Sequence, residues 1–330
     1  MRIALIHNPI TQRYSDQIYQ TDRQRRDKVE EVLKSAIIQL GHEVICLASG
    51  YLLIDQLGKF KPDIVFYQTF RNSRRVAETA PLKVLEQLRI PYTGSPIAAC
   101  KLALDKARTK SILQSAGIPT PRYVVVEQPD HLDRADPLSF PLFIKPTLGG
   151  ASLGISDQNP VYSAKSLEEV VKATIDKCGS PVLVEEFLTG REFTVGLLGS
   201  MPVQVLPMKE FIFHPGIDQA GKYRSYQKKM DSQSRDTSTC PADLSQLVKH
   251  RIENLSVRTF NILGCTDYGR VDIRCDCEGA PNVLEVNVHP SLLPDGSSFA
   301  QMALTAGINF PQLIGRIIQS ACCRHQLESG

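Results

Sequence analysis

The stretch GRVDIRCDCEGAPNVLEVN, residues 269–287, indicates two β-strands joined by a turn. Polar and apolar residues alternate in both halves, which is typical of strands with one buried face. A symmetric turn at the central Glu-Gly pair places Asp272 opposite Glu285. The same register places Arg270 opposite Asn287. The hairpin is therefore expected to bring two carboxylates together on its polar face.

Two carboxylates that face each other across a sheet repel, so this hairpin needs a compensating positive charge. Arg270 or Arg274 could supply that charge in an ordinary surface network. A hard divalent cation is the other solution, because two carboxylates and an amide oxygen are ligands that Mg²⁺ accepts. The hairpin alone leaves the arginine network and the metal site equally open.

The composition is that of an ordinary globular protein: 330 residues, 42% hydrophobic and 22% charged, enough for two or three domains. The net charge of +3 is too small to indicate a nucleic acid or a membrane surface as partner. No apolar run reaches the ~18 residues of a membrane span. The opening MRIALIHNP predicts a buried strand rather than a signal peptide. Nine cysteines without a CxxC pair indicate reduced thiols in a cytoplasm.

The first 95 residues alternate strand and helix patterns, which predicts a small parallel α/β unit with ligands at the carboxyl ends of its strands. Its strands are expected over 2–7, 42–48 and 61–69, and its helices over 23–41 and 80–89. No glycine follows the first strand, so a dinucleotide-binding fingerprint is absent. Downstream helices are expected over 102–117, 166–179, 244–262 and 309–321. The polar segment 214–240 lacks periodicity, which favours a mobile loop or lid.

The stretch FIKPTLGGASLGIS, residues 143–156, indicates a buried strand that ends near Lys145 and runs into a glycine-rich loop. Closely spaced glycines let backbone N–H groups approach phosphate oxygens, and the lysine adds a positive charge. The order of residues in a Walker A loop is absent. An ordinary glycine-rich turn remains the alternative to a phosphate site.

Two lysines, the glycine loop, the stretch VEEFLTGREFTV and the carboxylate hairpin follow one another in an order that resembles the ATP-grasp superfamily. Within it, the chain looks most like the D-alanine–D-alanine ligases over about two-thirds of its length. The resemblance implies an α/β (α+β) ATP-grasp fold of three domains, with the nucleotide between the second and third. The expected domains are a parallel α/β domain over 1–95, a central domain over 96–188 and a metal-bearing C-terminal domain over 189–330.

The resemblance also implies roles for individual residues. Lys106 and Lys145 would contact the ATP phosphates, and the loop containing Gly150, Ala151 and Ser152 would close over them. The adenine slot would be lined by Glu185, Glu186, Phe187 and Leu188, with Glu192 on the ribose hydroxyls. Two Mg²⁺ ions, or Mn²⁺ instead, would be held by Asp272, Glu285 and Asn287. Arg270 would steady the reacting centre, and Lys229 would reach the terminal phosphate from the lid.

The substrate half departs from the family pattern. The glutamate that holds the first D-alanine has no clear counterpart, Ser291 replaces a glycine, and Ala151 and Met230 replace a serine and a tyrosine. An acid substrate is expected near His7, Arg71, Arg74 and Ser291, and an amino acid near Asp295, Gly296, Ser297 and Ser298. The arginines suit bidentate recognition of a carboxylate, although a solvated basic loop explains them equally well.

The sequence thus predicts an ATP-dependent ligase that joins an amino acid to a carboxylate, or a similar oxygen electrophile, through a phosphorylated intermediate. The expected setting is natural-product biosynthesis, such as that of mycosporine-like amino acids. Two alternatives stay open: the D-alanine–D-alanine ligase of peptidoglycan synthesis, and a non-catalytic ATP-binding regulatory protein. The expected partners are a small acid and an amino acid, in a cytoplasmic protein that binds neither nucleic acid nor membrane. The resemblance to the D-alanine–D-alanine ligases implies a homodimer.

Overall fold

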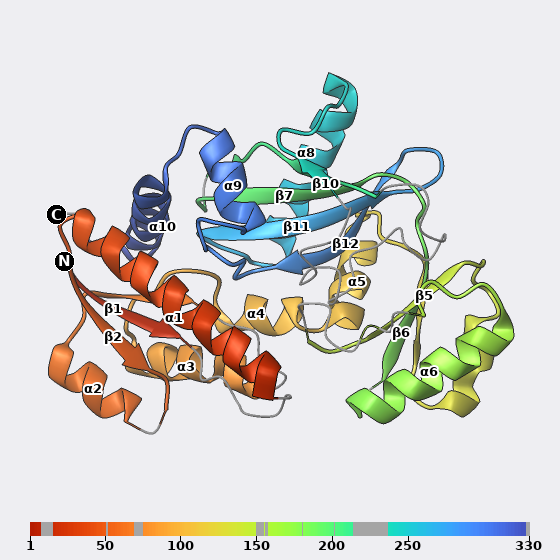
Figure 1. The fold of residues 1–330 in the computed structure, drawn as a ribbon, viewed down its shortest axis with the longest axis horizontal. Coiled ribbons are helices and arrows are strands. Elements are labelled where there is room, and N and C mark those ends of the chain that lie inside the picture. Colours follow the sequence, from red (N-terminus) through yellow and green to blue (C-terminus); the bar gives the residue numbers. More distant parts are fainter. Residues whose placement is uncertain are drawn as a thin grey trace.

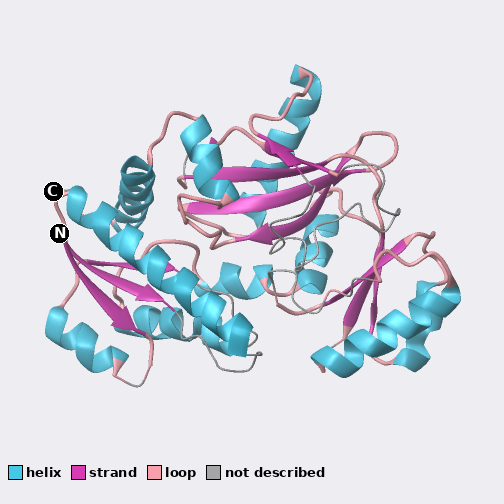
Figure 2. Ribbon diagram, viewed as in Figure 1, coloured by secondary structure: helices cyan, strands magenta, loops and turns pink. Residues whose placement is uncertain are grey.

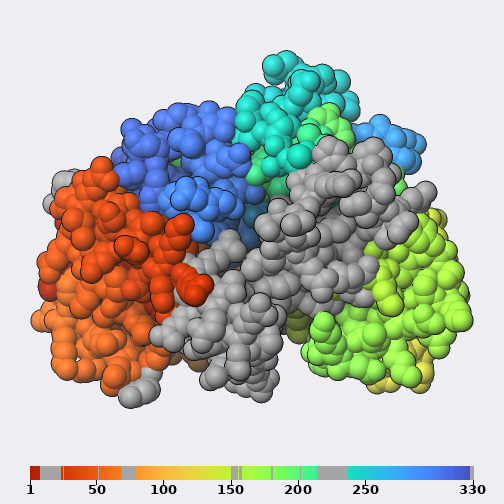
Figure 3. Space-filling model, viewed as in Figure 1, coloured from red at the N-terminus to blue at the C-terminus, as the bar shows by residue number. Residues whose placement is uncertain are grey.

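The computed structural model describes residues 1–7, 16–50, 52–68, 75–149, 155, 158–179, 181–200, 202–213 and 237–327. Three sheets organise this part of the chain, and helices pack around each of them (Figures 1 and 2). In the space-filling view, the N-terminal and central units lie at opposite ends of the molecule, and the C-terminal elements span the top between them (Figure 3). None of the described helices is long and apolar enough to cross a membrane.

The N-terminal unit is a three-stranded parallel sheet in the order β2-β1-β3, as the sequence predicts. Its strands are β1 (Arg2–His7), β2 (Glu43–Ala48) and β3 (Ile64–Gln68). Its helices are α1 (Asp16–Gln39), α2 (Leu53–Phe60) and α3 (Arg75–Leu88). Helix α1 begins earlier than expected, and the short helix α2 was not predicted. The final helix of the chain returns to pack on α1, so the two termini lie close together (Figure 1).

The central unit is a small antiparallel sheet in the order β4-β6-β5. It contains β4 (Tyr123–Val126), the 3₁₀-helix η1 (Pro129–Ala135), β5 (Leu142–Pro146), α6 (Ala164–Cys178) and β6 (Val182–Glu186). A reciprocal capping box between Ser163 and Ser166 begins α6, and the left-handed Gly179 ends it. Strand and helix side chains such as Ile144, Val170 and Val184 form a separate small core.

The predicted single helix over 102–117 is wrong, because the chain forms two helices there. These are α4 (Ile97–Ala103) and α5 (Lys106–Ser115). The break occurs because the Asp105 carboxylate accepts a hydrogen bond from the Arg108 backbone N–H at 3.1 Å, which makes Asp105 the N-cap of α5. The buried Leu113 places α5 in the core shared by the N-terminal and C-terminal sheets rather than in that of the central unit.

The C-terminal sheet has six strands in the order β10-β9-β7-β11-β12, with β8 paired to β7. They are β7 (Glu192–Leu198), β8 (Gln204–Val205), β9 (Lys209–Ile212), β10 (Thr237–Thr239), β11 (Tyr268–Cys275) and β12 (Pro281–Asn287). The helices are α8 (Gln246–Ile262), α9 (Ser298–Thr305) and α10 (Phe310–His325). Strand β10 falls inside the segment expected to be an irregular lid, and it pairs with β9 instead. Helix α9 was also not predicted.

The β11–β12 hairpin confirms the predicted register at its polar end, where Asp272 lies opposite Glu285. The turn is closed by a hydrogen bond between the Asp276 N–H and the Ala280 carbonyl, which centres it on Glu278 instead of between Glu278 and Gly279. The register then shifts, because Ile273 pairs with Val283 and leaves Leu284 as the extra residue of a β-bulge. The predicted pairing was therefore correct at the carboxylates only because a bulge restores it.

Candidate active site

A buried cluster of three charged side chains joins α5 to the central sheet. The Glu185 carboxylate lies between two ammonium groups, with Lys145 Nζ 2.5 Å from Oε1 and Lys110 Nζ 2.9 Å from Oε2. None of the three side chains is more than 7% exposed. Charges this deeply buried are tolerated only when they are paired. Burial alone would raise the pKa of Glu185, but the two lysines hold it below its usual value. Burial lowers the pKa of Lys110 to about 8.

Lys106, the first residue of α5, is tied to the start of the glycine-rich loop. Its Nζ donates a hydrogen bond to the Gly149 carbonyl, and its backbone N–H donates to Thr147 at 2.9 Å. Gly149 adopts a left-handed φ of 97°, which turns the chain where the loop begins. Lys106 and Lys145 thus both lie where β5 meets this loop. The predicted loop residues Gly150, Ala151 and Ser152 lie outside the described residues.

The predicted nucleotide slot contains an aromatic stack capped by an arginine. The Phe187 ring stacks on Phe143 at a centroid distance of 5.9 Å, and the Arg274 guanidinium lies 4.6 Å from the Phe187 centroid. The Arg274 Nη1 also donates to Glu192 Oε2 at 2.9 Å. Arg274 therefore joins the residues predicted for the base and for the ribose, although the sequence suggested it only as a partner for the facing carboxylates.

Backbone hydrogen bonds fix the strand end that carries Glu186 and Leu188. The Glu186 N–H donates to the Arg122 carbonyl at 3.0 Å, and the Phe187 N–H donates to Pro141 at 2.9 Å. The Glu186 carboxylate accepts from the Arg122 side chain at 3.1 Å. These two N–H groups hold the segment in place, so any backbone recognition of a base depends on other groups.

At the hairpin, Arg270 neutralises the facing carboxylates. Its Nε and Nη2 donate to the two oxygens of Asp272 at 2.9 and 2.8 Å, and the Thr194 hydroxyl also donates to Asp272. Burial would lower the pKa of Arg270, but Asp272 and Glu285 raise it above its usual value. The arginine network considered for the sequence thus forms with Arg270, whereas Arg274 pairs with Glu192 instead.

The oxygen donors of this hairpin fit a magnesium ion. In the described part of the chain, no group of three or more His, Cys, Asp or Glu side chains could hold a metal. Asp272 and Glu285 face each other as a pair, and Asn287 adds an amide oxygen on the same strand as Glu285. The Asn287 Oδ1 also accepts from the His289 backbone N–H at 3.1 Å, which orients the amide. Such a set of hard oxygen ligands is the kind that Mg²⁺ binds together with water or phosphate.

The residues predicted to bind substrate make local contacts in this structure. His7 Nε2 lies 2.8 Å from Glu30 Oε2 at the carboxyl end of β1, and Asp295 lies 3.8 Å from Lys28. The Ser297 hydroxyl accepts from the Ala300 N–H as the N-cap of α9, whose first residue is Ser298. Gly296 adopts a left-handed φ of 106°, and the Ser291 hydroxyl accepts from the Leu293 N–H. Arg71, Arg74 and Lys229 lie outside the described residues. The substrate roles of this set stay predictions.

Sequence reasoning missed two residues of this region, Lys110 and His289, and gave Arg274 a different role from the one it has in the structure. Lys110 follows Lys106 by four residues, a spacing that places both on one side of a helix and could have drawn attention to it. His289 is buried behind the hairpin, and its Nε2 has no hydrogen-bond partner among the described residues. That nitrogen would lie 2.7 Å from a Cβ added at Gly94, so only glycine fits opposite it. Burial lowers the pKa of His289 to about 4.

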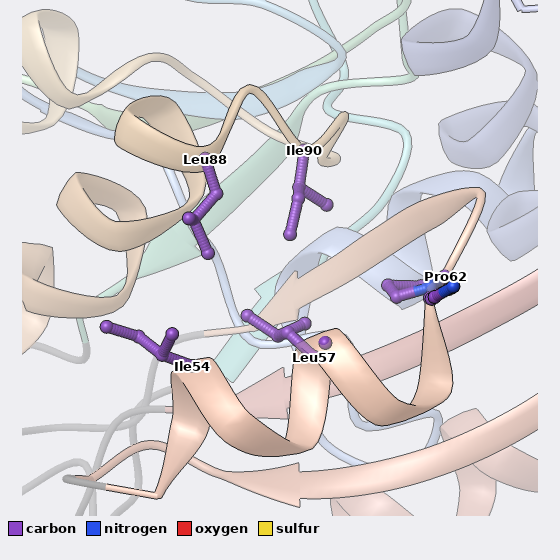
Figure 4. A pocket seen from close by; sticks show the side chains of 7 residues that line it. Ile54, Leu57, Pro62, Leu88 and Ile90 are labelled. Atoms are coloured by element: carbon purple, nitrogen blue, oxygen red, sulfur yellow. The ribbon is translucent and has the colours of Figure 1, made fainter.

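A shallow apolar pocket of about 340 Å³ lies far from this chemistry, on the N-terminal unit. It is formed between α2 and the end of α3, with Ile54, Leu57 and Leu88 among its lining residues (Figure 4). Its lining offers one charged side chain, Lys61, and no group that could act in catalysis. The pocket is therefore not part of the candidate active site.

Comparisons with known proteins agree with this geometry. Residues 112–319 match the family model described as the D-ala D-ala ligase C-terminus. The D-alanine–D-alanine ligase of Nitrosomonas europaea is 38% identical over 239 residues, 72% of this chain and 73% of that protein. An uncharacterized protein, y4sG of Sinorhizobium fredii, is 30% identical over 90% of this chain and 88% of its own length. The solved D-alanine–D-alanine ligase of Bacillus anthracis has the same fold, with a TM-score of 0.77, 99% coverage of both chains and 23% identity.

The three-sheet architecture and these matches define the class as an ATP-grasp protein, which confirms the expected fold. The chain belongs to the D-alanine–D-alanine ligase family, and it is an ATP-grasp ligase that forms a carbon–nitrogen bond. The resemblance seen in the sequence is thereby confirmed. The domain limits at residues 95 and 188 remain a prediction.

Proposed function

We propose that this ligase uses ATP to convert a carboxylate into an acyl phosphate, which the amine of an amino acid then attacks, releasing ADP and phosphate. The observation that carries the proposal is the buried Lys110–Glu185–Lys145 cluster at the base of the glycine-rich loop. It holds a lysine rigidly where a phosphate site is expected, at a desolvation cost that a purely structural position would avoid. A related ligase from Bacillus anthracis was solved in complex with ATP, which supports the choice of nucleotide.

In this proposal some residues of the site bind ATP and Mg²⁺, and others stabilise the charge that develops during the reaction. Lys106 and Lys145 neutralise phosphate charge, which lets a carboxylate approach the terminal phosphorus. Asp272, Glu285 and Asn287 would hold Mg²⁺, which supplies charge neutralisation on the transferring phosphoryl group when bound. Arg270 is the donor we assign to the oxyanion of the tetrahedral intermediate, since its guanidinium lies at this hairpin. Exclusion of water from the closed site protects the acyl phosphate from hydrolysis.

The acid substrate differs from D-alanine in this proposal. The turn after the metal ligands carries His289 and Ser291, and the His289 ring fills the space against Gly94 behind the hairpin. The His7–Glu30 pair at the end of β1 changes the other side of the expected substrate site. A biosynthetic ligase for a larger acid, as in the formation of mycosporine-like amino acids, fits these changes. The second candidate is a D-alanine–D-alanine ligase, which is favoured by the 38% identity to the Nitrosomonas europaea enzyme.

A panel of acids and amino acids tests the proposal. Each pair is incubated with Mg²⁺ and ATP, ADP release is followed, and products are identified by mass spectrometry, with the Asp272→Asn variant as background. We expect the fastest release with an acid other than D-alanine. Efficient formation of D-alanyl-D-alanine would establish the second candidate instead. The predicted homodimer belongs to this proposal, and light scattering should give twice the chain mass of 36.6 kDa.

A further inference from the structure

Lys110 makes contacts in two directions, although its side chain is only 1% exposed. One contact is the ion pair with Glu185, which also holds Lys145. The other is a hydrogen bond from Nζ to the Thr120 hydroxyl at 2.6 Å. In Figure 1, α5 lies beneath β12 and beside β5 and β6, so it occupies the place where the central unit meets the C-terminal sheet. A single buried ammonium therefore bridges the two halves of the site.

Thr120, which accepts the hydrogen bond from Lys110, is itself hydrogen-bonded to β12 of the hairpin. Its hydroxyl donates to the Val283 carbonyl at 2.8 Å, and the Val283 N–H donates to the Pro119 carbonyl at 2.8 Å. Residues 119–120 thus hold the outer edge of β12 at Val283, by hydrogen bonds to both its N–H and its carbonyl. We call this pair of hydrogen bonds the clasp. Val283 is the last residue before the bulge at Leu284.

The bulge determines which side chain faces Asp272. The strand pairs nearest the turn, such as Arg274 with Asn282, would in a regular ladder continue to place Leu284 opposite Asp272. Glu285 would then point to the other face of the sheet, because side chains alternate along a strand. The extra residue restores Glu285 to the polar face, and the clasp at Val283 fixes where that residue is inserted.

We propose that Lys110 is a positioning residue: it holds the Thr120 clasp on the β12 bulge, and thereby the metal carboxylate Glu285, in register with the phosphate lysine Lys145. The inference rests on the proposed function, since nucleotide and Mg²⁺ are what the positioned groups would bind. A merely structural Lys110 would balance the charge of Glu185 and have no effect on metal binding.

The test measures ADP binding by calorimetry with and without Mg²⁺, and thermal unfolding, for matched variants. Thr120→Val removes the hydroxyl at constant shape, and Thr120→Ser keeps it. Thr174→Val is the control, because the Thr174 hydroxyl is more buried than that of Thr120 but bonds within α6, to the Val170 carbonyl. Lys110→Met removes the ammonium itself. Because Lys110→Met leaves Glu185 with one partner fewer and could fail to fold, Thr120→Val decides the question.

Mg²⁺ raises the affinity for ADP by some factor in the unmodified protein. We expect that factor to be about tenfold smaller in Thr120→Val, because one hydrogen bond to the bulge is lost. Its affinity for ADP without Mg²⁺ should stay within about twofold of the unmodified protein, and Thr120→Ser should restore the Mg²⁺ effect. Lys110→Met should weaken ADP binding both with and without the metal. If Mg²⁺ raised ADP affinity in Thr120→Val as much as in the unmodified protein, the inference about Lys110 would be overturned. The same holds if Thr174→Val lost as much of the Mg²⁺ effect as Thr120→Val. Neither result would contradict the proposed function. Absence of ADP binding by the unmodified protein would overturn the proposed function as well.

Discussion

Asp272 shows how one side chain serves two partners. It accepts two hydrogen bonds from Arg270 and another from Thr194, while Glu285 faces it across the strand pair. The arginine offsets the repulsion between the two carboxylates as long as both remain on the polar face. A bound cation would share the oxygens of Asp272 with that guanidinium, so Asp272 links the metal site to the residue assigned to the oxyanion.

The two carboxylates should therefore respond differently to neutralisation. Asp272→Asn leaves the Arg270 guanidinium without its carboxylate partner and should lower the free energy of unfolding by about 1–3 kcal/mol. Glu285→Gln removes an attraction to Arg270 but also the repulsion with Asp272, so the free energy of unfolding should change less than in Asp272→Asn. Both variants should lose ligase turnover, because each removes a metal ligand. Urea unfolding and ADP release measure the two effects, and full activity of either variant at ordinary Mg²⁺ would show that the hairpin is structural.

Arg274 should control nucleotide affinity through Glu192 and Phe187. Arg274→Met keeps the bulk but removes the donor to Glu192 and the cation over the ring, so KM for ATP should rise about tenfold. The maximal rate should change less, because the interaction is made in the ground state as well as in the transition state. Arg274→Lys should recover little, since an ammonium lacks the planar fork. An unchanged KM for ATP in both variants would exclude Arg274 from the nucleotide site.

At the scale of elements, helices and strands with a regular hydrophobic pattern could be predicted from the sequence, whereas a bulge within a strand could not. The parallel N-terminal strands, the β11–β12 hairpin and α6 all follow from periodicity and end signals in the sequence. The bulge at Leu284 could not be read from alternation, because it is fixed by residues 119–120, which are distant in sequence. Lys110 escaped notice for a similar reason: a helical lysine looks solvated until the fold places Glu185 beside it.

The break between α4 and α5 offers a test at this scale. Asp105 caps α5, and the next residue is Lys106, so the cap sets the direction of a predicted phosphate ligand. Asp105→Ala should lower the free energy of unfolding by about 1 kcal/mol, as for other N-caps, and should raise KM for ATP. Asp105→Asn keeps a capping oxygen and should behave nearly like the unmodified protein. Equal effects of the two substitutions would contradict a capping role.

At the scale of the whole molecule, burial should sort the thiols by reactivity. Burial is the main cause that raises the pKa of Cys46 to about 11 and that of Cys265 to about 12, whereas Cys277 and Cys323 are exposed. Reaction requires the thiolate, so the native protein at pH 8 should be modified first at the exposed pair. Raising the pH to about 9.5 should add little labelling of Cys265, because its thiol stays protonated. Disulfide-exchange labelling with peptide mapping measures this, and early modification of Cys265 would mean that its core opens readily.

The transfer of oxygen from acid to phosphate tests the central claim most directly. The acid that proves most active in the panel is prepared with ¹⁸O in both carboxylate oxygens and is turned over with unlabelled ATP and the amino acid. An acyl phosphate forms through one carboxylate oxygen, and attack of the amine on the carbonyl carbon leaves that oxygen on the phosphate. The account predicts one ¹⁸O in each phosphate released, in proportion to product. Phosphate free of ¹⁸O, with product still formed, would contradict it.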